Sequence, residues 1–542
     1  MGKWELHTDG EALCRYIDSC VPERTSLYVL AHNAFFDVQA CGFFRYFTEL
    51  GWTLSFIYEA GLSYILTIKS GRRTIKVLST TNWFQTSLKK LGDLIDLPKL
   101  DIDLNEDDYE SVKAYCKRDT EIIVKAVEGY LLMLEQNDLG KFGLTRASQS
   151  FHAFRHRFMD VSIAVHTNEE IVNLERSAYM GGRTEAFYLG THHAKDFVSL
   201  DINSMYPHIM RTFDLPRELV DYKEDIIETD LDGLLSRYCV VAECEVSTPE
   251  PVYAKRMDDK IIFPIGEFTA FLTTPGVKYA YETGQLVRVK RIALYNKANL
   301  FSEYIDYFYA LRQKYKSEGN TTYEQICKYF MNSLYGKFGQ KQPIETKTDV
   351  HAPGMYIRHE LFDTVTGEME TETILCNKRI IHSGFTESAN SFVSIPAHIT
   401  EYGRFMLWSL IKHAGVDNVL YCDTDSIKME SRYLDRVGDY LDNDELGKLK
   451  VEERFNEFTI NGCKDYRTEN TIKLKGVPKS AETNADGSYS YQSFLSQSSH
   501  LRLQTMDSYI IRDVRKVCSR VYTKGVVNYD GTVVPIRLFD FD

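Results

Sequence analysis

Two carboxylates that stand one residue apart, Asp423 and Asp425, lie in the run YCDTDSIKM at residues 421–429. The apolar stretches on both sides each predict a short strand, and DTDS is typical of the turn of a tight hairpin. Side chains two positions apart on an extended chain point the same way, so both carboxylates can face one point in space. Like charges held close together repel, and a bound divalent cation relieves that repulsion. An isolated DxD is more often an acidic surface turn, so the prediction depends on other segments.

A third carboxylate, Asp201, ends the strand-like run DFVSLDI at residues 196–202. If Asp201 meets the hairpin, the site has the acidic, oxygen-only ligand set that suits Mg²⁺. Two metal ions about 3.5–4 Å apart are the general device for in-line phosphoryl transfer. The alternative for Asp201 is a cap at the end of a strand.

A cation, an amide and an aromatic ring recur at helical spacing in KYFMNSLYGKFG, at residues 328–339. Lys328, Asn332 and Tyr335 fall on one helical face, and Gly336 is the expected end of the helix. Such a face suits a triphosphate, a sugar and a base. The alternative is an amphipathic helix with an incidental lysine.

These three segments, in this order, resemble motifs A, B and C of the family B DNA polymerases. DINSMYP resembles the Dx₂SLYP pattern with Met205 in place of leucine, KYFMNSLYG resembles Kx₃NSxYG, and YCDTDS matches YxDTDS. One such motif alone would be a weak signal, whereas several in the family's order have a very low chance rate.

Two further segments resemble motifs of the protein-primed branch, which is found in certain phages, adenoviruses and linear plasmids. AYMGGR, with Tyr179, Gly181 and Gly182, resembles its YxGG motif, and CKDYR, with Lys464 and Tyr466, resembles its KxY motif. A glycine pair lets another backbone, here a template strand, approach closely. The resemblance covers nearly the whole chain.

The resemblance implies roles for the matched residues. The expected catalytic residues are Asp201, Asp423, Asp425 and Lys328. The expected ligands of two Mg²⁺ ions, for which Mn²⁺ can substitute, are Asp201, the carbonyl of Ile202 and Asp425. The expected nucleotide-binding residues are Tyr206, which would exclude a 2′-hydroxyl, Lys328, Asn332 and Tyr335. The expected DNA-binding residues are Tyr179, Gly181, Gly182, Ser204, Lys464 and Tyr466.

The N-terminal third resembles a proofreading 3′–5′ exonuclease domain. VLAHNAFFD, with Asn33 and Asp37, and AYCKRDTEI, with Tyr115 and Asp119, resemble its second and third motifs. SLKKL resembles a motif that holds single-stranded primer, and LPKLDID supplies a further exonuclease lysine; the residues concerned are Ser87, Leu88 and Lys99. The alternatives are an asparagine turn and an amphipathic helix.

The first exonuclease motif, a DxE pair on a buried strand, is expected well before Asn33, where Asp9 and Glu11 are the only candidates. That run follows polar residues, and Thr8 to Glu11 predicts a capping box that opens a helix. Two of the four carboxylates that clamp the exonuclease metals are therefore expected to be missing. The sequence predicts weak or absent proofreading.

The expected fold class is α/β and α+β multidomain, with a ribonuclease-H-like exonuclease domain followed by a right-hand polymerase that carries two insertions. The expected order is the exonuclease-like domain at 1–150, a connector with the YxGG motif at 151–195, the palm with the first insertion at 196–300, the fingers at 301–340, the second insertion as a β-hairpin at 341–385, the palm again at 386–480 and the thumb at 481–542. A length of 542 residues agrees with three or four domains.

The net charge of −13 argues mildly against a nucleic-acid partner. Two segments are basic although the chain as a whole is acidic. Residues 312–341 contain six basic and two acidic side chains, and residues 464–479 contain five basic and two acidic side chains. Such segments suit a DNA channel, because each phosphate contact needs a local cation. Ordinary solvated helix faces are the alternative.

Residue usage points to an intracellular protein with no membrane association. There is no apolar run of about 18 residues, and the start MGKWELHTDG lacks the pattern of a secretory signal. The 11 cysteines form no CxxC pair, so neither a zinc ribbon nor a disulfide framework is indicated.

The sequence therefore predicts a monomeric DNA-templated DNA polymerase that replicates a phage, viral or linear-plasmid genome. Its expected partners are primer-template DNA, dNTPs and a terminal protein that serves as primer. Two other classes stay open. One is a catalytically silent DNA-binding scaffold, which the intact Asp201, Asp425 and Lys328 disfavour. The other is a nuclease, which the missing DxE disfavours.

Overall fold

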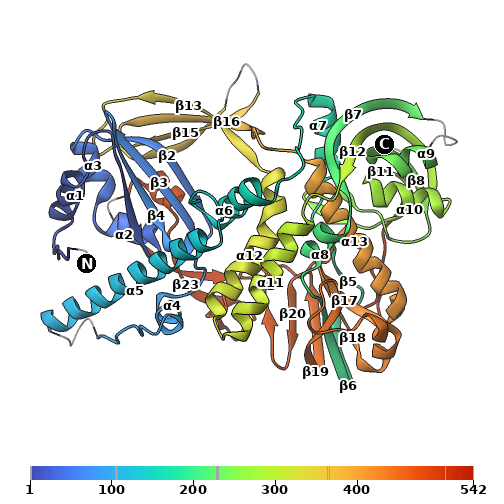
Figure 1. The fold of residues 1–542 in the computed structure, drawn as a ribbon. Helices are drawn as coiled ribbons and strands as arrows, with labels where there is room; N and C mark the ends of the chain where they lie inside the picture. The colour runs from blue at the N-terminus through green and yellow to red at the C-terminus, as the bar shows by residue number, and fades with distance from the viewer. Residues whose placement is uncertain are drawn as a thin grey trace.

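A computed structural model describes residues 3–103, 108–226, 231–362, 364, 367–506 and 508–540. The N-terminal part and the part that carries the predicted catalytic segments lie at opposite ends of the molecule, joined by a group of helices (Figure 1). In the part of the chain that the structure describes, no helix is both long and apolar enough to cross a membrane.

The N-terminal part is built on a four-stranded sheet in the order β1-β4-β3-β2. Its strands are β1 (Ser26–Ala31), β2 (Thr53–Ala60), β3 (Ser63–Ser70) and β4 (Arg73–Ser79). β1 runs parallel to β4, whereas the other neighbours are antiparallel. The accompanying helices are α1 (Gly10–Ser19), α2 (Ala34–Ala40), α3 (Phe43–Glu49), α4 (Leu88–Leu94) and α5 (Tyr109–Gln136).

The start of α1 differs from the predicted capping box. The N-cap is Asp9, not Thr8, and its carboxylate accepts hydrogen bonds from the backbone N–H groups of Glu11 and Ala12. Asp is as good an N-cap as Thr, and here it is the residue that reaches the free N–H groups of the first turn.

A seven-stranded antiparallel sheet carries the predicted catalytic strands in the order β21-β20-β19-β6-β18-β17-β5. The strands are β5 (Thr184–Ala186), β6 (Gly190–Ile202), β17 (Val419–Asp423), β18 (Ser426–Glu430), β19 (Leu449–Gly462), β20 (Asp465–Thr468) and β21 (Ile472–Lys473). The strand at residues 190–202 and the hairpin at 419–430 are neighbours here, although more than 200 residues separate them in the chain. The predicted hairpin and strand are confirmed.

Several helices share one hydrophobic core with this sheet. They include α7 (Glu169–Ala178), α8 (Met205–Thr212), α10 (Thr274–Glu282) and α13 (Ser394–Ala414). α13 is buried along most of its length and ends before Gly415, which has a φ of 90°.

Two long helices follow one another across a short turn, as predicted: α11 (Ser302–Ser317) and α12 (Thr321–Phe338). α12 does not end at Gly336, however, but continues to Phe338 and is capped by Gly339. Phe338 is 3% exposed in the main core, and that burial outweighs the cost of about 1 kcal/mol for a glycine inside a helix. α6 (Arg146–Ala153) packs against α12.

A second large sheet has the order β27-β11-β8-β12-β7. Its strands are β7 (Leu215–Ile226), β8 (Cys239–Thr248), β11 (Ile265–Thr273), β12 (Leu286–Ala298) and β27 (Arg537–Asp540). β27 runs parallel to β11, so residues 537–540 return to a sheet built mainly from residues 215–298.

The β-hairpin predicted within residues 341–385 is present as β14 (Ile357–Phe362) and β15 (Met369–Leu375), in antiparallel register. Turn residues 363, 365 and 366 lie outside the described part. Two strands that were not predicted, β13 (Lys341–Asp349) and β16 (Lys378–Glu387), extend it to a sheet in the order β13-β16-β15-β14. β13 is exposed at every position, so it lacks the alternation that reveals a strand.

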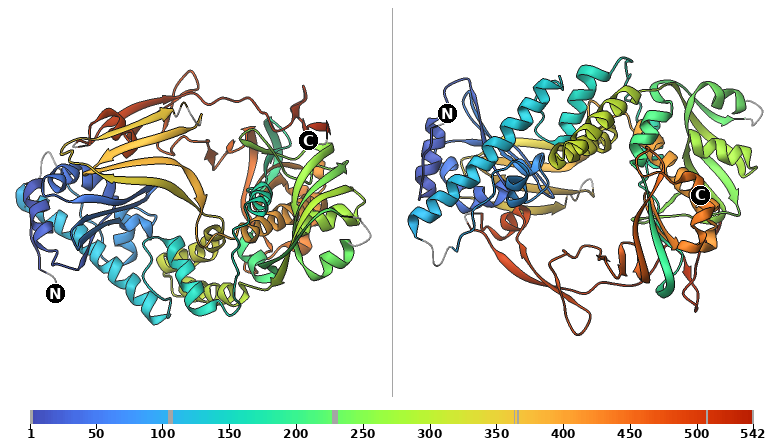
Figure 2. Two further views of the ribbon diagram at one scale, coloured as in Figure 1. Left: turned by 90° about the horizontal axis from the view of Figure 1, so that it is seen from above. Right: turned by 60° about the horizontal axis from the view of Figure 1, so that its bottom comes forward.

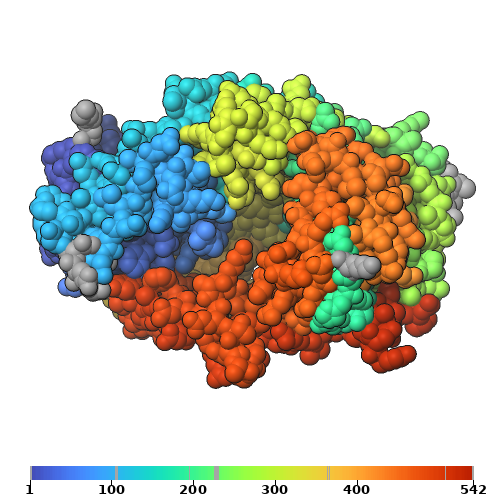
Figure 3. Space-filling model, turned by 90° about the horizontal axis from the view of Figure 1, so that it is seen from below, coloured from blue at the N-terminus to red at the C-terminus, as the bar shows by residue number. Residues whose placement is uncertain are grey.

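The C-terminal segment crosses between the two ends of the molecule (Figure 2). It contains β22 (Glu482–Thr483), β23 (Tyr489–Phe494), α14 (Gln497–Leu503) and β24 (Ile511–Lys516). Leu501 and Met506 from this segment, and Tyr356 and Leu375 from the β13–β16 sheet, share a hydrophobic core with the N-terminal part. A hollow opens at the centre of the face that Figure 3 shows, bordered by the N-terminal part, α11 and α12, the seven-stranded sheet and the C-terminal segment.

Candidate active site

The pairing of β6 with β18 brings Asp201 to the catalytic hairpin. Asp201 lies opposite Ser426 in the antiparallel register. The backbone N–H of Ile202 donates a hydrogen bond of 2.7 Å to the carbonyl of Asp425. The end of one strand and the turn of the hairpin are thus fixed together by main-chain contacts, and Asp201 and Asp425 come from both sides of that junction.

The pKa values of these two carboxyls are both raised. Burial, and then the charge of Asp425, raises the pKa of Asp201 to about 7. Burial raises the pKa of Asp425 to about 6, with Asp423 adding to the effect. The cation of Lys328 lowers the pKa of both. Two partly buried, mutually repelling carboxyls favour a bound cation, which would remove the repulsion.

Asp423 is held by other partners. Its Oδ1 accepts hydrogen bonds from the hydroxyls of Thr184, at 3.0 Å, and Thr424, at 3.2 Å, and lies 3.6 Å from Nζ of Lys464. Among the described residues no group of three or more His, Cys, Asp or Glu side chains has the arrangement of a metal site. The carboxylate of Glu452 also raises the pKa of both Asp201 and Asp425, so the junction is acidic beyond this pair.

α12 presents Lys328, Asn332 and Tyr335 on one face, as their spacing predicted. The Asn332 amide donates a hydrogen bond of 2.8 Å to the carbonyl of Lys328, and the Lys328 side chain is exposed. The ring of Tyr335 lies 5.2 Å from the ring of Tyr206, centroid to centroid. The two predicted nucleotide-binding segments, on α8 and α12, therefore meet at this aromatic pair.

Tyr206 lies in the first turn of α8, directly after Ser204, whose φ of 52° turns the chain away from β6. Burial raises the pKa of Tyr206 above its ordinary value. The Oγ of Ser204 accepts a hydrogen bond of 3.4 Å from Arg312 of α11. Gly403 of α13 allows the ring to approach, because a Cβ at that position would lie 3.0 Å from Cε1 of Tyr206.

The YMGG segment packs against the turn of the catalytic hairpin. A Cβ at Gly182 would lie 2.7 Å from Cγ2 of Thr424, so only glycine fits without a shift. The Thr424 N–H also donates a hydrogen bond of 2.6 Å to the carbonyl of Arg183. Glycine at position 182 is therefore required by contact with the protein itself, which the sequence did not reveal. At Gly181 there is room for a side chain, because the nearest atom to a Cβ would be 3.9 Å away.

Arg404 holds the same segment from α13, and the sequence reading missed it. This arginine is 3% exposed, and its Nη1 donates hydrogen bonds to the carbonyls of Met180 at 2.8 Å and Gly181 at 3.0 Å. Tyr179, just before them, packs on Gly339, where a Cβ would lie 2.8 Å from the tyrosine ring. The available signal for Arg404 was a charged residue within the largely apolar stretch of the helix at 394–414, three positions after Glu401.

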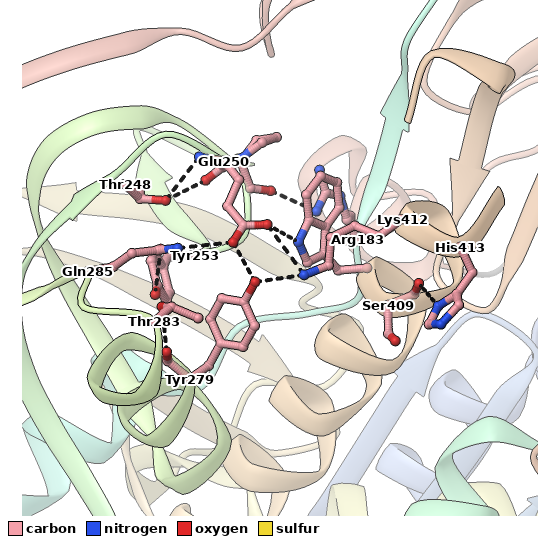
Figure 4. A network of polar contacts seen from close by, with 12 residues as sticks. Arg183, Thr248, Glu250, Tyr253, Tyr279, Thr283, Gln285, Ser409, Lys412 and His413 are labelled. Carbon is pink, nitrogen blue, oxygen red and sulfur yellow. Dashed lines mark hydrogen bonds and ion pairs between the residues drawn. The ribbon is translucent and has the colours of Figure 1, made fainter. Parts of the chain in front are cut away.

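A buried network anchors the chain just after YMGG (Figure 4). Arg183 donates hydrogen bonds to Glu185 at 2.6 Å and to the carbonyl of Pro251 at 2.8 Å, and its guanidinium lies 4.6 Å from the ring of Trp408. Glu250 accepts hydrogen bonds from Trp408 and from the hydroxyl of Tyr279. The network ties β5 to the second large sheet and to α13.

Lys464 and Tyr466 are attached to the catalytic hairpin. The Lys464 N–H donates a hydrogen bond of 2.9 Å to the hydroxyl of Tyr421, and φ of Lys464 is 59°. The ring of Tyr466 lies 5.2 Å from that of Tyr421. This KDY segment therefore lies beside Asp423, on the same sheet.

The structure also brings together several residues of the N-terminal part. Lys99 forms an ion pair of 2.6 Å with Asp119 and lies 4.5 Å from the ring of Tyr115. Asn33 adopts a φ of 65° before α2, which carries Asp37. Burial raises the pKa of Asp37 to about 6. Ser87 caps α4 by accepting a hydrogen bond from the N–H of Lys90, and Leu88 follows it as the first residue of that helix.

The DxE candidate that precedes Asn33 is not on a strand. Asp9 caps α1, and Glu11 forms an exposed ion pair of 2.8 Å with Arg15 one turn later. Neither carboxylate contacts Asp37 or Asp119 in any described hydrogen bond or ion pair.

Comparison with known proteins gives consistent relatives. The family described as DNA polymerase type B, organellar and viral, matches residues 95–414. A probable DNA polymerase of Neurospora intermedia is 25% identical over 371 residues, covering 65% of this chain and 37% of that protein. The DNA-directed DNA polymerase of Enterobacteria phage PRD1 is 29% identical over 309 residues, covering 55% of this chain and 51% of that protein.

A solved structure shares the fold. Phi29 DNA polymerase complexed with primer-template DNA and incoming nucleotide substrates superposes with a TM-score of 0.67 and 16% sequence identity, covering 93% of both chains. This chain spans about a third of the length of the fungal relatives, at 37% and 30% of two of them. The family match extends over more than half of the chain, and the chain therefore belongs to the organellar and viral type B DNA polymerases.

Proposed function

We propose that this protein is a DNA-templated DNA polymerase that adds dNTPs to a primer by phosphoryl transfer. The observation that carries the proposal is the junction of β6 with the β17–β18 hairpin, where Asp201 and Asp425 meet with raised pKa values. Family membership supports the same activity.

The residues at the junction fit a divalent cation. The donors Asp201, Asp425 and the carbonyl of Ile202 are the oxygen ligands that Mg²⁺ prefers, and Mn²⁺ accepts the same set. When bound, two such ions lower the pKa of the primer 3′-hydroxyl and neutralise the triphosphate. Asp423, which is hydrogen-bonded to Thr184, supports the hairpin.

The face of α12 binds the incoming nucleotide in this proposal. Lys328 pairs with its phosphates as negative charge develops on the leaving pyrophosphate. Asn332 and Tyr335 shape the nascent base pair. Tyr206, whose ring touches the same site, lies under the sugar and excludes a 2′-hydroxyl.

Primer-template DNA occupies the central hollow seen in Figure 3. The similar phi29 polymerase was solved with primer-template DNA and incoming nucleotides, which supports this placement. Lys464 and Tyr466 steady the primer terminus. The remaining contacts to DNA are assigned to Tyr179, Gly181, Gly182 and Ser204.

The domain assignment follows the resemblance. Residues 1–150 form a ribonuclease-H-like exonuclease domain, 301–340 the fingers and 481–542 the thumb. The insertions lie within 196–300 and at 341–385, where the structure has the four-stranded β13–β16 sheet. The protein acts as a monomer, starts from a terminal protein, and works inside the compartment that holds its phage, viral or linear-plasmid genome.

Proofreading is weak or absent in this proposal. Asp9 and Glu11 are engaged at the start of α1. They would have been half of the four expected metal-binding carboxylates. Incubation of a 3′-mismatched, end-labelled primer with Mg²⁺ should leave it intact, and excision that disappears in Asp119→Ala would contradict this assignment.

Extension of an end-labelled primer on a DNA template with Mg²⁺ and dNTPs tests the main proposal. We expect extension by the wild type, loss of at least a thousandfold in Asp425→Ala, and normal extension by Asp417→Ala, an exposed aspartate just before β17. Retention of DNA binding without extension by the wild type, on primers with either a 3′-hydroxyl or a protein hydroxyl, would favour the silent scaffold.

A further inference from the structure

Lys428 is a buried lysine on the sheet that carries the catalytic aspartates. It lies on β18 and is 5% exposed. In the pairing of β18 with β6, Lys428 stands opposite Ser199 and Ser426 stands opposite Asp201. Because side chains two apart on a strand share a face, Lys428 projects from the same face of the sheet as Asp201, one step further from the turn.

The ammonium of Lys428 lies between two groups. Its Nζ donates a hydrogen bond of 2.6 Å to the hydroxyl of Ser199, which is 1% exposed. It also lies 5.2 Å from the centroid of the Tyr466 ring. Lys428 has no ion pair with a carboxylate among the described residues, which is unusual because buried lysines are normally paired.

The charges around Lys428 are mixed. Burial lowers its pKa, whereas the carboxylates of Glu453 and Glu452 raise it. Glu453 lies opposite Ser199 on β19 and accepts a hydrogen bond of 2.7 Å from Thr468. The carboxylates favour the charged form of the lysine without occupying its hydrogen-bonding positions.

The hydroxyl of Tyr466 is free to bond outside the chain. Among the described residues it makes no hydrogen bond, although the ring is packed against Tyr421 and Phe458. Burial, and then Asp423, raises the pKa of Tyr466 to about 12, so the hydroxyl is protonated and can donate at neutral pH. A buried ring with an uncommitted donor beside the active site suits an anionic oxygen of a bound ligand.

We propose that Lys428 is a positioning residue for the primer terminus: its ammonium, fixed by Ser199, holds the ring of Tyr466 and strengthens its hydroxyl as a donor to a primer phosphodiester. The attraction of a cation for the face of an aromatic ring fixes the ring and draws electron density from it. Lys428 itself is too buried to touch DNA. This inference rests on the proposed contact of Tyr466 with the primer.

A purely structural role for Lys428 would give a different pattern of effects. Loss of a structural lysine would lower stability and maximal rate whether or not Tyr466 keeps its hydroxyl. Loss of a residue that acts through Tyr466 weakens primer binding selectively, and it does so only while that hydroxyl is present. A double-mutant cycle distinguishes the two cases.

The test compares Lys428→Met, Tyr466→Phe and the double variant, with Lys297→Met as the matched control. Lys297 also donates one hydrogen bond, of 2.8 Å to the carbonyl of Ser236, but on β12 of the other sheet. The measurements are the Kd for a primer-template, by fluorescence anisotropy, and the single-turnover rate at saturating DNA and dNTP. Thermal unfolding is recorded for each variant.

We expect Lys428→Met to raise the primer-template Kd about tenfold, within the range of a buried cation–π contact. Tyr466→Phe should do the same, and the double variant should be no worse than either. The saturated rate should change by less than about twofold, and Lys297→Met should bind as the wild type does.

Additive losses in the double variant, or wild-type binding by Lys428→Met, would overturn the inference while leaving the primer role of Tyr466 intact. Wild-type binding by Tyr466→Phe would instead refute that role, and the inference with it. If Lys428→Met does not fold, Ser199→Ala takes its place in the cycle. Ser199→Ala keeps the charge of Lys428 but removes the hydrogen bond that holds its ammonium. A rise of a fewfold in the primer-template Kd that is absent in the Tyr466→Phe background would support the inference. A rise of the same size in both backgrounds would contradict it.

Discussion

The ionised forms of Asp201 and Asp425 are electrostatically unfavourable in the protein alone. Both carboxyls are partly buried, Asp425 raises the pKa of Asp201, Asp423 raises that of Asp425, and Lys328 offsets only part of these effects. Groups with perturbed pKa values concentrate where chemistry or binding is to happen. At the scale of the residue, the site is prepared for a cation and a polyphosphate.

Cation binding should therefore depend steeply on pH. One proton is bound to the Asp201–Asp425 pair below about pH 7 and a second below about pH 6, so a divalent cation has to displace them. Calorimetric titration with Mn²⁺ should show affinity falling about tenfold per pH unit between about pH 7 and 6, where one proton is displaced, and about a hundredfold per unit below about pH 6, where two are displaced. Little change is expected between about pH 7.5 and 8.5. An affinity that does not vary between pH 5.5 and 8 would contradict the raised values.

The same carboxyls should affect the stability of the metal-free protein. Their folded pKa values exceed the ordinary value of 3.8, so between about pH 4 and 7 the folded state binds more protons than the unfolded state. The free energy of unfolding should fall as pH rises through that window. Asp201→Asn should remove part of the fall and stabilise the metal-free protein at pH 8 by about 2 kcal/mol, as measured by urea unfolding.

Tyr206 should decide which sugar is accepted. The centroid of its ring lies 5.2 Å from that of Tyr335, and the ring also packs closely against α13 at Gly403. Tyr206→Val removes the ring and should raise the efficiency of rNTP incorporation relative to dNTP by about a hundredfold, on the order of 3 kcal/mol of lost discrimination. Single-nucleotide insertion assays measure the ratio, and Tyr402→Val, which alters a tyrosine packed on Phe213 instead, is the control.

At the scale of the element, the catalytic turn is held by segments far away in the chain. The turn of β17–β18 contacts the YMGG segment through Thr424, and Arg404 of α13 binds the carbonyls of that segment. β6 fixes the other side through the N–H of Ile202. The two carboxylates are thus placed by three elements that no local pattern connects.

Gly182→Ala should displace the catalytic turn. The added methyl group would lie 2.7 Å from Cγ2 and 2.9 Å from Oγ1 of Thr424. Since the displaced residue lies between Asp423 and Asp425, we expect the single-turnover rate to fall by at least tenfold with thermal stability lowered by about 1–3 kcal/mol.

Two further variants sharpen that experiment. Gly438→Ala adds a methyl group with nothing within 4 Å and should behave as the wild type. Thr424→Ala in the Gly182→Ala background removes both crowding atoms and should restore part of the rate. If the second substitution gives no recovery, steric contact with Thr424 is not the cause.

At the scale of the whole molecule, parts that are distant in sequence share one core. The N-terminal sheet, the β13–β16 sheet and α14 together bury a cluster that includes Trp52, Leu375 and Leu501. β27 returns to β11 at the other end of the molecule. The C-terminal segment is therefore attached at both ends, across the hollow where we place the DNA (Figures 2 and 3).

Leu501→Ala should loosen one of these attachments. Leu501 is 3% exposed in the shared core, so its truncation should cost about 2–5 kcal/mol in the stability of that region. Hydrogen exchange should rise in α14 and in the N-terminal sheet together, and processive extension should shorten. Leu503→Ala, at a position that is 59% exposed on the same helix, should do neither.

Residue types and spacing suggested a cation site at Asp201, Asp423 and Asp425 and a phosphate-binding helix face at Lys328, because alternation on a strand and the turn of a helix are set by local geometry. The catalytic roles proposed for these residues came from the resemblance of the three segments to family motifs. Strand alternation and turn residues also predicted the hairpin that the structure shows as β17 and β18.

The way these segments meet could be seen only in the folded chain. α12 continues past Gly336, Gly182 packs against Thr424, and Arg404 binds a carbonyl of the YMGG segment. Each of these features depends on neighbours from other parts of the chain. The fully exposed strand β13 is formed by pairing with β16 rather than by its own pattern. Packing and strand register are long-range properties, so no local window of the sequence contains them. They bring the carboxylates of Asp201 and Asp425 to one junction, where their repulsion favours the binding of a cation.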